Sequence, residues 1–101
     1  MFVEHKAPGE VRELDGASNN LLRAASLIEK RGWHQGSLFK DGRYCIVGAI
    51  SNVRNSIEEM VMAWSLMDQS VGNAAMWNDT PGRTKDEVVA KLRAVALGRV
   101  Q

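Results

Sequence analysis

Two capping boxes constrain the fold of this chain more than any other feature of its sequence. In a capping box, a serine or threonine caps the start of a helix while a glutamate in the first turn reaches back to the cap. Ser56–Glu59 and Thr84–Glu87 both fit this pattern, so each predicts a helix start. Apolar residues at helical spacing follow both boxes and predict two buried faces: Ile57, Met60, Val61, Trp64, Met67 and Val71 after the first, and Val88, Leu92, Val95 and Ala96 after the second.

A third helix is predicted near the N-terminal end of the chain. Ser18 or Asn19 can cap it, because their short side chains accept hydrogen bonds from free backbone N–H groups. Gly32 can end it, because glycine readily adopts the positive φ of a helix stop. Its apolar residues again recur at helical spacing: Leu21, Ala24, Ala25 and Ile28.

The pair Asp41-Gly42 predicts a β-hairpin, since a two-residue type I′ turn requires positive φ at both positions. In that register Phe39 faces Tyr44, and Leu38 faces the single cysteine, Cys45. Residues 45–53 could then form a strand or a helix, and the small residues 48 and 49 favour a short helix that packs closely.

Residues 74–79 are expected to form a helical turn that buries Trp77. Pro81-Gly82 follows, and it fits the centre of a type II turn, where proline fixes φ and glycine supplies positive φ. The sequence therefore predicts a mainly α fold. We expect a compact four-helix domain with a short β-hairpin between helices 1 and 2 and an irregular N-terminal arm. The arm is predicted over residues 1–17 and the single helical domain over residues 18–101, since 101 residues suit one domain.

The balance of charge argues against a dedicated nucleic-acid-binding protein. Thirteen Lys and Arg residues offset 12 Asp and Glu residues, which leaves a net charge of +1, whereas affinity for phosphates depends on an excess of cations. One cysteine cannot form an internal disulfide, and no Cys and His spacing is typical of a zinc site. We therefore expect no metal and no cofactor. The absence of a long apolar run favours a cytoplasmic protein without a membrane partner.

Four separated blocks of the sequence resemble a small uncharacterised domain family of actinobacteria and their phages. The first three blocks are residues 21–25, 31–36 and 42–49, and the fourth consists of residues 77–79, 82–84 and 87–88. The similarity runs from about Leu21 to Ala96. The chain departs from the family pattern at residues 1–15 and at His34, where the family favours cysteine. The resemblance implies a shared fold and a phage-encoded or prophage-derived protein in the host cytoplasm, but no activity.

Cys45 is the best candidate for a catalytic nucleophile. A thiol at a helix N-terminus can have a lowered pKa, His34 could act as its base, and Asn78 or Asp79 could orient the histidine. These groups would make a cysteine-dependent hydrolase or transferase. The alternative is that Cys45 is a small buried apolar residue, which its position opposite Leu38 favours.

Binding of another protein is the function that the sequence favours over catalysis. The partner could be a host protein, a phage protein or a second copy of the chain. Aromatic side chains near loops anchor such interfaces when they are exposed, and Arg83 could pair with Asp79. Weak nucleic-acid binding through the C-terminal helix is a further alternative, although Asp86 and Glu87 interrupt its cations. The predicted binding residues are Trp33, Tyr44, Met76, Trp77, Asp79 and Arg83.

Overall fold

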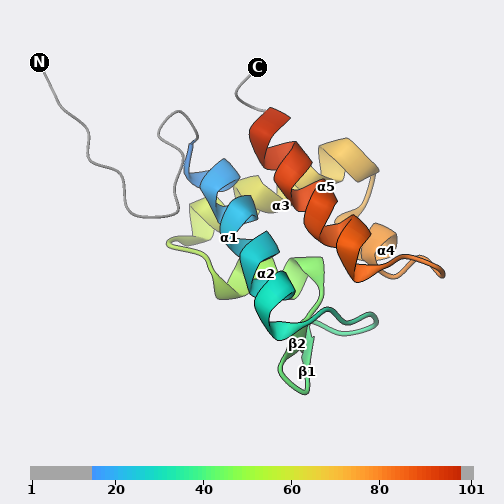
Figure 1. Ribbon diagram of the computed structural model, residues 1–101. Coiled ribbons are helices and arrows are strands. Elements are labelled where there is room, and N and C mark those ends of the chain that lie inside the picture. The colour runs from blue at the N-terminus through green and yellow to red at the C-terminus, as the bar shows by residue number, and fades with distance from the viewer. Residues whose placement is uncertain (1–14, 99–101) are drawn as a thin grey trace, which may run out of the picture.

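A computed structural model describes residues 15–98 as a helical domain that carries one small hairpin (Figure 1). Within that range the chain forms five helices and two strands, as the sequence predicts except that the turn at residues 74–78 is a helix in its own right. The elements in chain order are α1 (Gly16–Arg31), β1 (Phe39–Lys40), β2 (Arg43–Tyr44), α2 (Ile46–Asn52), α3 (Ile57–Val71), α4 (Ala74–Asn78) and α5 (Lys85–Gly98).

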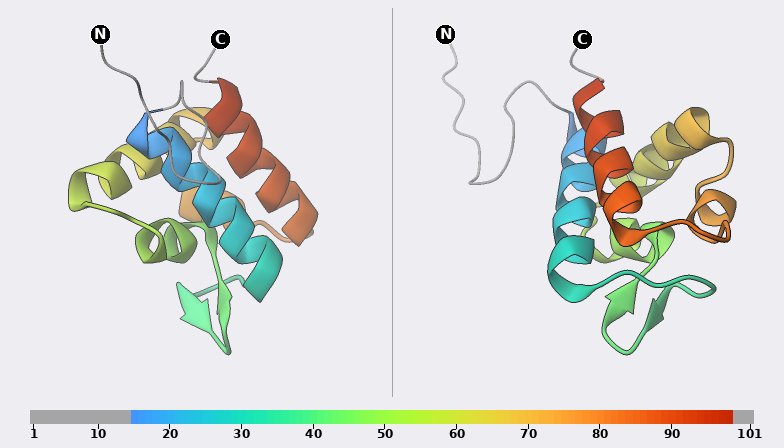
Figure 2. Two further views of the ribbon diagram at one scale, coloured as in Figure 1. Left: turned by 60° about the vertical axis from the view of Figure 1, so that its left-hand side comes forward. Right: turned by 45° about the vertical axis from the view of Figure 1, so that its right-hand side comes forward.

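Helices α1 and α5 lie side by side and run antiparallel, while α2, α3 and α4 lie behind them (Figures 1 and 2). The hairpin extends from the end of the domain where α1 stops. The apolar faces predicted for α1 and α5 are confirmed, and they meet α2 and α3 in one core. The fully buried apolar side chains include Leu21, Ile28, Ile46, Ile50, Met67, Val88 and Leu92.

Helix α1 begins earlier than predicted. Its cap is Asp15, whose carboxylate accepts from the Ser18 N–H at 2.8 Å, so neither Ser18 nor Asn19 caps the helix. Gly16 and Ala17, which the prediction placed in the N-terminal arm, belong to α1. The remainder of that arm, residues 1–14, lies outside the described residues.

The buried face of α3 matches the predicted one in part, since Met67 is buried and Met60, Trp64 and Val71 pack against the core. Ala63, Leu66 and Met67 face the core, whereas Ile57 and Val61 are 65% and 50% exposed. The helix is apolar around more than half of its circumference, so periodicity alone could not show which part the neighbouring helices cover.

The helix starts predicted from the two capping boxes are confirmed. Glu59 makes more contacts than a capping box requires. The Glu59 N–H donates to the Ser56 hydroxyl at 3.0 Å, as predicted, while its carboxylate accepts from the backbone N–H of Asn55 at 3.1 Å. The same carboxylate bonds Asn20 and Arg23 of α1, at 3.1 and 2.7 Å. Glu59 therefore fixes the start of α3 against α1.

The hairpin has the predicted register and turn. Phe39 pairs with Tyr44 and Lys40 with Arg43, and both turn residues have positive φ, 53° for Asp41 and 79° for Gly42. The Cys45 N–H donates to the Leu38 carbonyl at 3.2 Å, which continues the pairing up to the start of α2.

Gly48 lets α2 lie directly against the backbone of Leu38, the residue that precedes β1. A Cβ atom at residue 48 would overlap the backbone carbonyl of Leu38. The hairpin and α2 therefore meet backbone to backbone, which sets the geometry of the surface between them.

Candidate functional site

Asn78, at the end of α4, is completely buried and joins three segments of the chain. Its side-chain oxygen accepts from the indole N–H of Trp33 at 2.7 Å and from the backbone N–H of Ile46 at 3.1 Å. Its side-chain nitrogen donates to the His34 carbonyl at 3.1 Å and to the Asp79 carboxylate at 2.9 Å. These four bonds use the whole hydrogen-bonding capacity expected of one amide, so Asn78 has a structural role here.

The loop that follows α1 is held against the end of α4 by two further residues. Gln35 donates to the carbonyls of Asn78 and Thr80, at 2.9 and 3.0 Å. The Gly36 N–H donates to the Asp79 carboxylate at 3.0 Å, with φ of 98° at the glycine. Asp79 is thus engaged with the loop backbone, and Gly36 provides the positive φ that this contact requires.

Cys45 lies at the N-terminus of α2, as predicted, but it is only 6% exposed. Its sulfur accepts from the Gly48 N–H at 3.3 Å. Burial raises the pKa of the thiol, and the negative charge of Asp79 acts in the same direction. These two effects outweigh the helix N-terminus, so the environment favours the neutral thiol over the nucleophilic thiolate.

The residues proposed to assist Cys45 are engaged elsewhere. The His34 ring bonds the Ser37 hydroxyl at 2.6 Å, and no hydrogen bond joins His34 to Cys45 within residues 15–98. A small cavity of about 130 Å³ lies beside the thiol, lined by Gly36, Ser37, Leu38, Cys45, Val47, Ala75 and Asp79. The geometry gives no support to a thiol nucleophile with a histidine base.

Arg83 and Trp77, both predicted binding residues, contact each other. The guanidinium lies 3.9 Å from the centre of the Trp77 ring, and its Nε donates to the Trp77 carbonyl at 3.0 Å. A second nitrogen lies 3.7 Å from the Glu87 carboxylate. The predicted pairing of Arg83 with Asp79 is therefore not formed. The type II turn predicted at Pro81-Gly82 is present, since Gly82 has φ of 87°.

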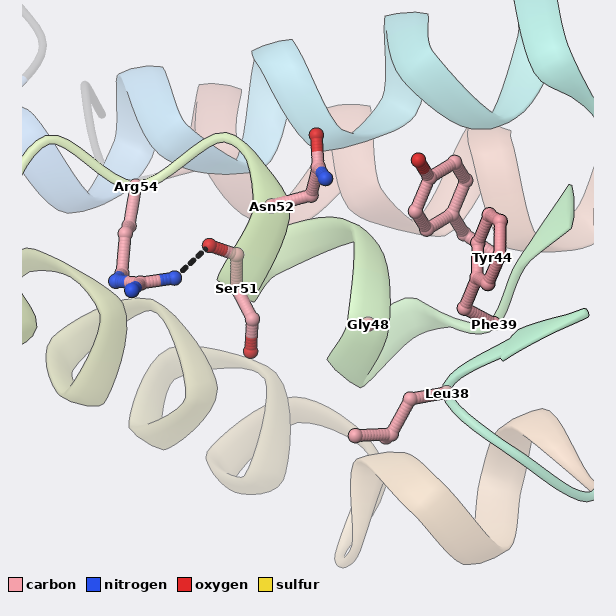
Figure 3. A pocket seen from close by; sticks show the side chains of 7 residues that line it. All are labelled: Leu38, Phe39, Tyr44, Gly48, Ser51, Asn52 and Arg54. Atoms are coloured by element: carbon pink, nitrogen blue, oxygen red, sulfur yellow. Dashed lines mark hydrogen bonds between the residues drawn. The ribbon is translucent and has the colours of Figure 1, made fainter. Parts of the chain in front are cut away.

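An open groove of about 400 Å³ lies between the hairpin and the exposed side of α2 (Figure 3). Tyr44 lines it, as a binding residue should, and its ring packs against Phe39 with 5.1 Å between centroids and 55° between planes. Leu38 and Phe39 are each 56% exposed. The residues that line the groove are Leu38, Phe39, Tyr44, Gly48, Ser51, Asn52 and Arg54.

Sequence reasoning missed Leu38 and Phe39 as surface residues, although the signal was present. A two-residue turn leaves the side chains just before it on the face of an isolated hairpin, where few elements can cover them. Of the other predicted binding residues, Met76 is 71% exposed on α4, whereas Trp33 and Trp77 are half-buried.

One cation of the C-terminal helix is paired with a carboxylate of α1. Arg93 of α5 forms an ion pair with Glu29 of α1, at 2.8 Å, and this hydrogen bond holds the pKa of Glu29 below its usual value. Among residues 15–98, no three His, Cys, Asp or Glu side chains are grouped in a way that could hold a metal ion. None of the helices in this part of the chain is long and apolar enough to cross a membrane.

The fold and the groove define a class of small helical domain with a hairpin seated on its second helix. Residues 13–97 match the model of a family of unknown function, DUF6197, and the chain belongs to that family. No curated protein and no solved structure matches the chain.

Proposed function

We propose that this protein is a small cytoplasmic protein-interaction module, encoded by a phage or prophage, that binds a host or phage protein rather than catalysing a reaction. The proposed contact surface is the hairpin groove, with the neighbouring exposed face of α4. We define the hairpin groove as the seven residues that line the cavity between the hairpin and α2.

The observation that supports this proposal most is the exposure of Leu38 and Phe39 at the edge of a concave surface. Each leaves more than half of its side chain in contact with water, at an energetic cost that burial against a partner would remove. Interfaces commonly place such apolar anchors beside pockets with a polar rim. Here Ser51, Asn52 and Arg54 supply polar groups beside the apolar side chains.

The main alternative, a cysteine-dependent hydrolase, has less support. A nucleophilic thiol has to be reachable and ionised, whereas Cys45 is buried and burial raises its pKa. The groove itself contains no pair of groups that could transfer a proton to or from a nucleophile, since Tyr44 and Arg54 are its only ionisable residues.

Affinity purification from an actinobacterial host lysate, with matched variants as bait, tests the proposal. We expect one or more proteins to be enriched by the wild-type chain and lost with Phe39→Asp. Ile57→Asp is the control, because Ile57 is comparably exposed but lies on α3, outside the groove. Circular dichroism of both variants checks that the fold is retained.

Three outcomes are informative. A protein captured by the wild type and Ile57→Asp but not by Phe39→Asp supports the hairpin groove as the interface. A protein captured equally by all three baits contradicts that location. No enriched protein, together with a strictly monomeric chain in analytical ultracentrifugation, contradicts the proposed function.

A further inference from the structure

We propose that the hairpin groove binds an internal peptide segment in which an apolar side chain is closely followed by aspartate or glutamate. This inference rests on the proposed function and specifies the chemistry of the partner. It depends on how apolar and cationic groups are distributed along the groove, which Figure 3 shows.

One end of the groove is apolar. Leu38, Phe39 and Tyr44 form its walls (Figure 3). Gly48 of α2 also lines this end, and it contributes only backbone atoms because it has no side chain. Because a Cβ at residue 48 would meet the Leu38 backbone, the walls and the helix are in fixed contact. This end suits one inserted apolar side chain, whose burial would remove water from the aromatic pair.

The other end of the groove is cationic. The Arg54 guanidinium lies across the groove from the Phe39 and Tyr44 rings (Figure 3), and one of its nitrogens donates to the Ser51 carbonyl. That bond orients the Arg54 side chain, and the other N–H groups of the exposed guanidinium remain able to donate to a ligand. A guanidinium with a free edge binds carboxylate oxygens well.

No carboxylate among the seven lining residues competes for Arg54. Lys40 and Arg43 form the next cross-strand pair after Phe39 and Tyr44, so they point to the opposite face of the hairpin and add only to the general positive charge of this region. Asp41 offsets this only in part, at 4.0 Å from Arg43. Direct contact with an acidic segment in the groove therefore depends on Arg54, while the hairpin cations attract such a segment at longer range.

A peptide fits these features better than a nucleic acid does. Only one cation lines the groove, and affinity for nucleic acids grows with the number of phosphates that are neutralised. The Phe39 and Tyr44 rings also pack against each other at a tilt rather than presenting separate flat faces for base stacking.

The carboxylate should come from an aspartate or glutamate side chain rather than from a chain terminus. Terminal carboxylates are usually captured by a closed ring of backbone N–H groups. The hairpin groove is open along α2, and its cation is a side chain that a passing segment can reach.

A peptide-display selection on the full chain tests the inference. Short random peptides are displayed between fixed flanks, and selected sequences are resynthesised with blocked termini for fluorescence anisotropy. We expect the selected peptides to share an apolar residue followed by Asp or Glu. Replacing that acid by lysine should weaken binding about tenfold or more, because it removes a charge-assisted hydrogen bond.

Two variants of matched charge change separate the groove from the general field of the protein. Arg54→Glu should weaken the acidic peptides about tenfold and bind their lysine counterparts better than the wild type does. Lys91→Glu changes the net charge equally but lies on α5, outside the groove, so it should leave binding nearly unchanged. Melting curves confirm that each variant is folded.

The inference and the proposed function fail in different ways. Peptides that lose binding with Phe39→Asp but show no preference for acid, and do not respond to Arg54→Glu, overturn the inference and leave the groove as an interface. If an apolar–acidic peptide binds only when its C-terminal carboxylate is free, and not when that carboxylate is blocked, the internal-segment assignment is overturned. Salt-sensitive binding of single-stranded oligo(dT) that displaces the peptides overturns it in favour of nucleic acid. If the wild-type chain enriches no peptide more strongly than the Phe39→Asp variant does, the result contradicts both the inference and the proposed function.

Discussion

Replacing Gly48 by alanine should separate the hairpin from α2. Residue 48 lies inside α2, and an added Cβ would overlap the Leu38 carbonyl oxygen and lie 2.8 Å from the Leu38 carbonyl carbon. Both atoms belong to the backbone, so no side-chain rotation can relieve the contact. The strand residue or the helix has to move, and the Cys45 N–H bond to the Leu38 carbonyl lies directly beside the overlap.

The magnitude follows from two opposing effects. Glycine to alanine inside a helix ordinarily stabilises by about 1 kcal/mol. Overpacking a tight contact costs about 1–3 kcal/mol, and a weakened backbone hydrogen bond adds about 1 kcal/mol. We therefore expect a net loss of about 2 kcal/mol in the free energy of unfolding, which lowers the melting temperature by roughly 10 °C in a domain of this size.

Thermal and urea unfolding followed by circular dichroism measures this effect, with Gly98→Ala as the matched control. Gly98 ends α5, and an added Cβ there meets no atom of residues 15–98 within 4 Å, so that variant should be neutral or slightly more stable. If Gly48→Ala proves as stable as Gly98→Ala, then α2 and the hairpin are not in backbone contact, and the described geometry of the groove is wrong.

Three further predictions concern the turn, the buried amide and the thiol. Gly42→Val places a β-branched residue at φ of 79°, so the melting temperature should fall by the equivalent of about 1–3 kcal/mol, and an unchanged value would refute the type I′ turn. Asn78→Ala leaves the N–H groups of Trp33 and Ile46 without their acceptor; urea unfolding should show a loss of about 2–4 kcal/mol, whereas a loss below about 1 kcal/mol would show that water replaces the amide. Burial raises the pKa of Cys45 above the ordinary 9.0, so the folded state keeps a proton that the unfolded chain releases, and stability should decrease as the pH rises above that value. Alkylation of the folded protein should correspondingly be slower than in denaturant, and faster reaction when folded would restore the nucleophile hypothesis.

Local signals in the sequence were sufficient to predict the hairpin and two of the helix starts. The Asp41-Gly42 turn, the Phe39–Tyr44 pairing and the caps at Ser56 and Thr84 each depend on residues within a few positions of one another. Interactions of this kind are decided by backbone geometry and by side chains close in the chain, so tertiary packing did not alter them.

Interactions between distant residues could not be predicted in the same way. Nothing in the sequence near Asn78 shows that its side chain bonds Trp33, 45 positions earlier. The buried side of α3 likewise depends on where α1 lies, because Ile57 and Met67 are equally apolar but only Met67 is covered. The groove was partly predicted through Tyr44, and its exposed edge became visible only once α2 was placed against the hairpin.

The contact of Asn78 with Ile46 also determines how parts of the domain open. Backbone N–H groups in the first turn of a helix normally exchange with solvent readily, because no carbonyl of that helix reaches them. The Ile46 N–H instead donates to a side chain 32 positions later, in α4. Deuterium exchange at the Ile46 amide therefore requires α2 and α4 to separate. Neither of these short helices is long enough to be stable alone. The exchange rate of this amide thus reports on the opening of α2 and α4 as one cooperative unit.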